Sequence, residues 1–291
     1  TTHIDLAKKI VPQIKAHPNA KKGVVVCAEE DILTKIVQPG DMVLCRVTAP
    51  LFQKAIACIK AKIPARIRGR DLCENLVTVL KKIEKIADST GSFKYADLTT
   101  LIDDWAVEEI KYLVKREASD SAIQLVSDKR ETLHICHRDI GAKDLDGLVA
   151  GIRSLIPSNK GDGRSISAVE FSTVHRAKGL EADRIFILEP SKLPLVWDKQ
   201  LDWQYQQEMN LLYVAVTRSK NFLCVLGTKF GFSRIPVEIV PTHGYVFENE
   251  KWVLKEIAEA EAIAKAKQAV EVKPTISSKD KVVKMKQPLL F

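Results

Sequence analysis

Short apolar runs of β type, separated by helical segments, constrain the fold of this 291-residue chain more than any other feature. After several of the runs, apolar residues recur at helical spacing. The runs occupy residues 23–27, 42–47, 65–67, 166–171, 184–188 and 222–227. Strands that alternate with helices predict a parallel sheet flanked by helices, and therefore an α/β fold.

The middle of the chain has a different pattern, with helical periodicity and few strand signals. It predicts helices over 95–117, 119–128 and 144–156, which would form an inserted helical subdomain. We also expect a helix over 1–22, a hairpin over 245–253, a helix over 255–270 and a disordered charged linker over 271–286. The expected organisation is a first α/β part over 1–91, a helical insertion over 92–160, a second α/β part over 161–254 and a C-terminal extension over 255–291.

The formal net charge of +8 suits a polyanionic partner such as nucleic acid. Many soluble proteins reach a similar charge, so composition alone leaves both interpretations open. No apolar run approaches the roughly 20 residues needed to cross a bilayer, so we expect no membrane contact. The six cysteines are scattered and form no CxxC pair, which favours a reducing, cytoplasmic compartment.

Two segments carry the most specific pattern. They are STVHRAKGLEAD at residues 172–183 and EMNLLYVAVTRS at residues 208–219. The second alone could be ordinary core, but the two in this order resemble motifs V and VI of the UvrD/Rep/PcrA group of superfamily 1 DNA helicases. The resemblance implies the second of two RecA-like motor domains, with a helical insertion shorter than the 2B subdomain of well-known members. It also implies ATP-driven movement on single-stranded DNA with 3′→5′ polarity.

Two arginines on separate elements could converge on a triphosphate, because the guanidinium fork matches phosphate oxygens. Residues 41–50 resemble helicase motif IV, which implies that Arg46 contacts the γ-phosphate. Arg218 matches the arginine finger of motif VI, and both arginines are therefore catalytic candidates. Glu181, which closely follows Gly179, matches the motif V glutamate that binds the nucleotide ribose. The alternative for a lone arginine after a strand is a surface ion pair.

The same resemblance implies a DNA contact. Thr173 and His175 match the motif V residues that contact the single strand, and histidine can pair with phosphate or stack on a base. Arg176 and Lys178 could add phosphate contacts, or could simply be solvated basic residues. His134 and the nearby His137 lack distant ligand partners, so we expect no metal site there.

Parts of the family pattern are missing. No G-x-x-x-x-G-K-[ST] stretch is present, and no apolar strand ends in an Asp-Glu magnesium site. The chain begins with Thr1 and enters a helical pattern directly, so we expect an N-terminal portion that supplies the Mg²⁺ ligands. The chain alone should then not hydrolyse ATP. The alternative is a non-enzymatic adaptor, derived from a helicase, that binds DNA and a sliding clamp.

The last five residues, QPLLF, resemble the short peptide that docks into the bacterial sliding clamp. Leu290 and Phe291 would fill an apolar pocket, and Gln287 would form hydrogen bonds at its edge. The eukaryotic type of clamp peptide fits less well, because the second aromatic residue is missing. The other alternative is an apolar chain end without a role.

Overall fold

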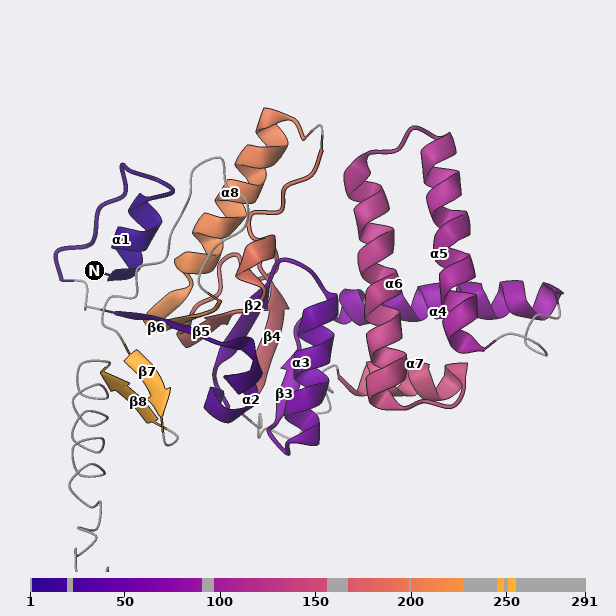
Figure 1. Cartoon of the computed structure of the whole chain (residues 1–291), viewed down its shortest axis with the longest axis horizontal. Coiled ribbons are helices and arrows are strands. Elements are labelled where there is room, and N and C mark those ends of the chain that lie inside the picture. The colour runs from indigo at the N-terminus through magenta and orange to yellow at the C-terminus, as the bar shows by residue number, and fades with distance from the viewer. Residues whose placement is uncertain are drawn as a thin grey trace, which may run out of the picture.

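A parallel sheet forms the centre of the computed structural model, which describes residues 2–19, 23–90, 97–155, 167–198, 200–227, 245–248 and 251–254 (Figure 1). The sheet has six strands in the order β1-β6-β5-β2-β4-β3, and every neighbouring pair is parallel. The strands are β1 (Val24–Ala28), β2 (Met42–Cys45), β3 (Ala65–Ile67), β4 (Val169–Thr173), β5 (Ala182–Ile187) and β6 (Ser219–Leu226). The predicted RecA-like α/β fold is confirmed.

Helices cover both faces of the sheet, which explains why its central strands are continuously apolar. All four residues of β2 are buried. One face packs against a cluster that includes residues of α2 (Leu33–Ile36) and α3 (Ala49–Lys60). The other packs against α1 (Thr2–Lys8) and α8 (Asp202–Val216). Short 3-10 helices, η1 (Glu30–Ile32) and η3 (Pro190–Lys192), follow β1 and β5.

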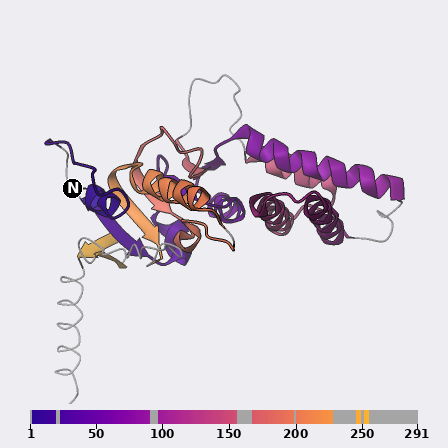
Figure 2. The ribbon, with the colours of Figure 1, turned by 90° about the horizontal axis from the view of Figure 1, so that it is seen from above.

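Four helices form a separate layer beside the sheet (Figures 1 and 2). They are α4 (Arg70–Thr90), α5 (Leu98–Lys115), α6 (Asp120–Ile140) and α7 (Leu145–Ser154). Helix α4 crosses behind α5 and α6 in Figure 1 and also contacts α7. The helical layer therefore begins at Arg70, whereas the sequence suggested that it begins at residue 92.

Two predicted helices have different lengths in the structure. Helix α1 ends at Lys8 and does not reach residue 22, because Pro12 cannot continue a helix interior. Helix α6 continues to Ile140, well past the predicted end at residue 128, and stops where Gly141 adopts a φ of 73°. Its second half was missed although Leu133 and Cys136 are fully buried at helical spacing.

A carboxylate of α6 links the helical layer to the α/β part. Asp128 of α6 accepts hydrogen bonds from the backbone N–H groups of Thr48, at 3.0 and 3.1 Å, and Ala49, at 3.3 Å. These groups begin helix α3, where N–H groups lack partners within the helix and a negative charge is favourable. The apolar core also continues without a break from α3 into α6. The helical insertion therefore contacts the start of α3, the segment that directly follows β2.

We expect Asp128→Ala to lower the free energy of unfolding by about 1–2 kcal/mol, because the start of α3 loses its cap. Urea denaturation followed by circular dichroism would measure the change. Asp88→Ala, which removes an exposed carboxylate from α4, should change stability by less than about 0.5 kcal/mol. Equal, small losses in both variants would contradict the capping role.

Beyond the sheet, β7 (Tyr245–Glu248) and β8 (Lys251–Leu254) pair antiparallel, as the predicted hairpin requires. No helix in the described residues is long and apolar enough to cross a membrane. The predicted helix over 255–270, the linker over 271–286 and the terminal QPLLF lie outside the described residues.

Candidate functional site

At the carboxyl end of the sheet, Arg46 forms a bidentate ion pair with Glu208. Arg46 directly follows β2, and Glu208 lies on α8. Arg46 Nε donates to Glu208 Oε2 at 2.7 Å, and Arg46 Nη2 donates to Oε1 at 2.6 Å. Glu208 Oε2 also accepts the backbone N–H of Leu195 at 3.1 Å. The Arg46 and Glu208 side chains are only 18% and 6% exposed, so this pair is largely removed from water.

His175 lies beside this pair, just after the end of β4. Partial withdrawal of the ring from water lowers the pKa of His175, and the positive charge of Arg46 lowers it further. Thr173 is buried, and its carbonyl accepts N–H groups from Arg176 at 3.0 Å and Ala177 at 3.1 Å. These bonds start a turn that leads from the carboxyl end of β4 back toward the start of β5. The structure therefore brings Thr173 and His175 together with Arg46.

A groove of about 250 Å³ adjoins Arg46, between the first turns of α6 and the loop after η3. Its lining includes the apolar side chains of Leu125, Val196 and Trp197 and the polar side chains of Gln124 and Asp128. A groove with an aromatic ring and an arginine beside it can accept a stacked base. The sequence did not point to this groove, because its two walls come from distant segments.

At the amino end of the sheet, Arg218 connects α8 to the turn before β5. Its Nε donates to the Val214 carbonyl at 3.1 Å, its Nη1 to the Leu180 carbonyl at 3.3 Å and its Nη2 to Thr217 Oγ1 at 3.1 Å. The positive charge also lies at the C-terminal end of α8, where cations are favourable. Arg218 is half-buried and engaged within the chain.

Glu181 and Gly179 share this end of the sheet. Glu181 is 54% exposed, and its carboxylate lies 3.9 Å from Lys220 Nζ. Gly179 has a φ of 83° and open space around it, and Lys178 is exposed. Lys178, Gly179 and Glu181 can therefore contact a ligand that approaches from solvent.

The expected convergence of Arg46 and Arg218 on one triphosphate is wrong. Arg46 follows β2, whereas Arg218 precedes β6, and both strands run parallel to β5 between them. The strand register separates their backbones by about eight residues, or roughly 25 Å at 3.3 Å per residue. Arg46 thus lies with Thr173 and His175, and Arg218 lies with Glu181.

Comparison with known families tests the resemblance. The family model described as the UvrD-like helicase C-terminal domain matches residues 74–229, just over half of the 291 residues. The chain belongs to this family. Both motif segments lie within the UvrD-like match, and Arg46 lies before it. No curated protein matches the chain.

Some residues of this UvrD-like domain carry contacts that the sequence did not predict. Glu208 begins the second motif segment, but its partner Arg46 is 162 positions away. Arg176 donates hydrogen bonds to Asp71, and this pairing uses part of the donor capacity of Arg176. Gln287, Leu290 and Phe291 lie outside the described residues, so the clamp contact stays a prediction.

Metal and thiol chemistry receive no support from the described residues. No group of three or more His, Cys, Asp or Glu side chains there could hold a metal ion. His134 instead contacts Asp103, at 2.6 Å. The six cysteines are free, and burial raises the pKa of Cys45 and Cys73 to about 12. Such thiols are poor nucleophiles.

Proposed function

We propose that this chain is the C-terminal motor half of an ATP-dependent helicase or translocase that acts on single-stranded DNA. The family match supports a helicase C-terminal domain. The separation of Thr173 and His175 from Glu181 and Arg218 supports two different binding sites at the two ends of the sheet. The carboxyl end of the sheet would face DNA, and the amino end would face ATP. The observation that carries this proposal is the grouping of Thr173 and His175 on one end and of Glu181 and Arg218 on the other.

On the DNA side, we propose that Arg46 acts with Thr173 and His175. Its Nε and one N–H of Nη2 hold Glu208, which leaves three N–H donors for a phosphate or a base edge. Glu208 would keep the guanidinium in place before DNA arrives, which reduces the ordering cost of binding. This role replaces the γ-phosphate contact that the sequence suggested for Arg46.

On the ATP side, the residues present fit part of a nucleotide. The exposed carboxylate of Glu181 can accept hydrogen bonds from ribose hydroxyls, and Arg218 can supply positive charge to a terminal phosphate. The chain has no phosphate-binding glycine loop. We propose that another domain supplies the loop and the Mg²⁺ ligands, and that this chain does not hydrolyse ATP alone. The proposed 3′→5′ polarity rests on the family resemblance.

Helix α8 links the two ends. It carries Glu208, the partner of Arg46, and its last turn provides the Val214 carbonyl that holds Arg218. A helix is stiff over this length, so movement of Arg218 toward a phosphate can be transmitted to the DNA side. This shared element supports coupling between the two proposed sites.

A pH dependence of DNA binding would test the DNA side. The pKa of His175 is lowered in the free chain, so the ring is neutral at pH 7.5. A DNA phosphate beside the ring would raise this pKa, so binding would take up a proton. Affinity should therefore increase as the pH falls below about 7, by about tenfold for each unit by which DNA raises the pKa. Fluorescence anisotropy with a labelled single strand would measure it.

The matched variants are His175→Gln and His17→Gln. The first should make DNA affinity insensitive to pH over this range, because glutamine does not titrate. The second removes an exposed histidine far from β4 in sequence and should keep the wild-type pH dependence. An unchanged pH dependence in His175→Gln would remove His175 from the DNA site.

A second candidate is a non-enzymatic adaptor, and one observation favours it. Three nitrogens of Arg218 already contact groups of the chain itself, as in a structural residue. Such an adaptor would bind DNA through the carboxyl end of the sheet and a sliding clamp through QPLLF. Substitution of Arg218 in an ATPase assay distinguishes the two candidates.

A further inference from the structure

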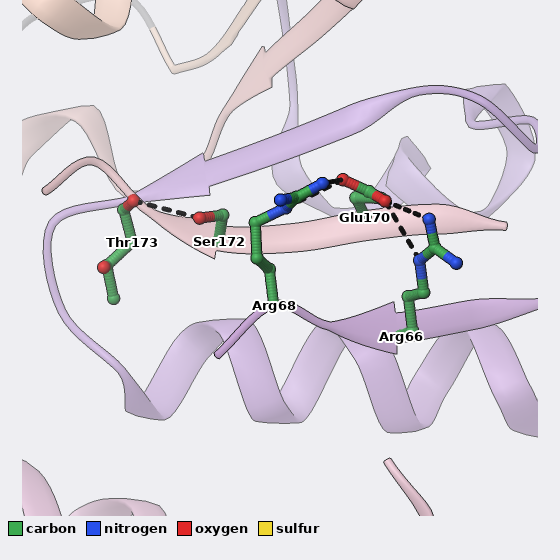
Figure 3. A network of polar contacts seen from close by, with 5 residues as sticks. All are labelled: Arg66, Arg68, Glu170, Ser172 and Thr173. Atoms are coloured by element: carbon green, nitrogen blue, oxygen red, sulfur yellow. Dashed lines mark hydrogen bonds and ion pairs between the residues drawn. The ribbon is translucent and has the colours of Figure 1, made fainter. Parts of the chain in front are cut away.

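Two arginines at the edge of the sheet share one carboxylate (Figure 3). Arg66 lies in edge strand β3, Arg68 directly follows it, and Glu170 lies on the neighbouring β4. Arg66 donates to Glu170 Oε1 through Nε, at 3.0 Å, and through Nη2. Arg68 donates to Oε2 through Nε at 3.0 Å and through Nη2 at 2.7 Å. Glu170 therefore holds both guanidinium groups in a fixed arrangement.

The arrangement keeps a net positive charge that faces solvent. Burial alone would raise the pKa of the Glu170 carboxyl, but hydrogen bonds from both arginines outweigh it and leave the pKa below its ordinary value. The carboxylate is therefore ionised and cancels one of the two positive charges. The Glu170 side chain is 14% exposed, whereas Arg66 and Arg68 are 32% and 41% exposed. Each guanidinium has three further N–H donors beyond those that hold Glu170.

Arg176 extends this basic edge toward the proposed DNA site. Its guanidinium packs on Gly69, the residue after Arg68, where a Cβ atom would lie only 2.9 Å from Arg176 Nη1. Gly69 also has a φ of 113°, so glycine provides both the turn and the close approach. We name Arg66, Arg68 and Arg176 the β3 basic strip. Arg66 lies at the sheet edge, and Arg176 lies in the turn that contains His175.

We infer that the β3 basic strip binds phosphates of a DNA strand, with Arg66 and Arg68 each contacting one. Arg66 and Arg68 are two residues apart along the chain, and each guanidinium binds a different oxygen of Glu170, so the two groups lie side by side and can each contact one phosphate. The inference rests on the proposed DNA-binding function and extends its site beyond the motif residues. Arg66 and Arg68 both precede the residues that the family model matches.

Charge favours DNA over a nucleotide as the source of phosphate. A cavity of about 420 Å³ that is lined by Arg66 and Arg68 is also lined by Asp41, Glu181, Asp183 and Lys220. With Glu170, its walls carry four carboxylates against the three cations Arg66, Arg68 and Lys220. Arg184 also pairs with Asp41, at 3.3 Å, so a triphosphate inside this cavity would meet no net positive charge. A strand that follows β3 along the edge of the sheet would contact the guanidinium groups of Arg66 and Arg68, which are 32% and 41% exposed.

The salt dependence of DNA binding tests the strip, because each phosphate contact adds about 0.7 to the slope of log K against log salt for a single strand. The variant is Arg66→Gln/Arg68→Gln/Glu170→Gln in the full chain, which leaves no unpaired buried carboxylate. The slope should become shallower by about 1.4, which corresponds to two lost phosphate contacts. The matched control is Arg153→Gln, which changes net charge equally but removes an arginine that pairs with Glu74 on α4. Its slope should equal that of the wild type.

A second variant guards against misfolding. Arg66→Lys/Arg68→Lys keeps both charges and should keep the wild-type slope, and thermal unfolding would verify that every variant is folded. A wild-type slope in the triple variant overturns the inference, while loss of affinity in Thr173→Ala/His175→Ala would still support the proposed function. Loss of ATP binding without a slope change would assign the arginines to a nucleotide and also overturn it. If the wild-type chain does not bind single-stranded DNA, both proposals fail.

Discussion

Glu208→Ala is expected to lower the free energy of unfolding by about 3 kcal/mol, measured by urea denaturation. The substitution leaves Arg46, which is only 18% exposed, without its carboxylate partner. Removal of one member of a largely buried pair costs about 3–5 kcal/mol, and the lower value applies here because Arg46 keeps some contact with water. The backbone N–H of Leu195 also loses its acceptor.

A double variant separates the charge effect from simple loss of packing. Arg46→Met/Glu208→Leu removes both charges and keeps much of the side-chain volume, so it should lose only about 1 kcal/mol, from the backbone N–H of Leu195 that no longer has its acceptor. Arg46→Met alone should be strongly destabilised, because Glu208 is then buried without a counter-charge. If Glu208→Ala costs less than about 1 kcal/mol, the pair does not order the carboxyl end of the sheet.

Short strands and the hairpin were predictable from the sequence, because turn residues and β-type runs lie next to each other in the chain. The short strand at 65–67 was predicted with its observed bounds, since Pro64 and Gly69 flank a β-type run. The hairpin of β7 and β8 was predicted for the same kind of reason. The strand order and the early start of the helical layer at Arg70 depend on contacts between distant segments. No periodicity within a single segment contains that information.

The candidate site shows the same limit. The motif segments identified Thr173, His175, Glu181 and Arg218 as candidates, but not which of them share an end of the sheet. The sequence grouped Arg46 with Arg218 because both resemble family arginines that act on the γ-phosphate. In a parallel sheet, a residue after one strand and a residue before another lie at opposite ends, so only the register could separate them.

Arg218→Ala is expected to lower DNA-stimulated ATP turnover about 1000-fold in the full-length gene product, if that product contains the phosphate-binding domain that we propose. An arginine at the transferring phosphate contributes about 10³–10⁵ in kcat, because its charge offsets the negative charge of the transition state. For this, the guanidinium must exchange its contacts with Val214 and Leu180 for a phosphate. Arg218→Lys should not restore turnover, because an ammonium lacks the planar fork.

The control for this experiment is Arg138→Ala, which removes an exposed arginine from α6 that pairs with the adjacent Asp139. It should leave turnover within about twofold of the wild type. Thermal unfolding must show that Arg218→Ala is folded, because the lost contacts at the end of α8 also stabilise the chain. A folded Arg218→Ala protein with wild-type turnover would make Arg218 a structural residue. The adaptor would then be the better account, since the ATP-facing end of the sheet would have no catalytic group.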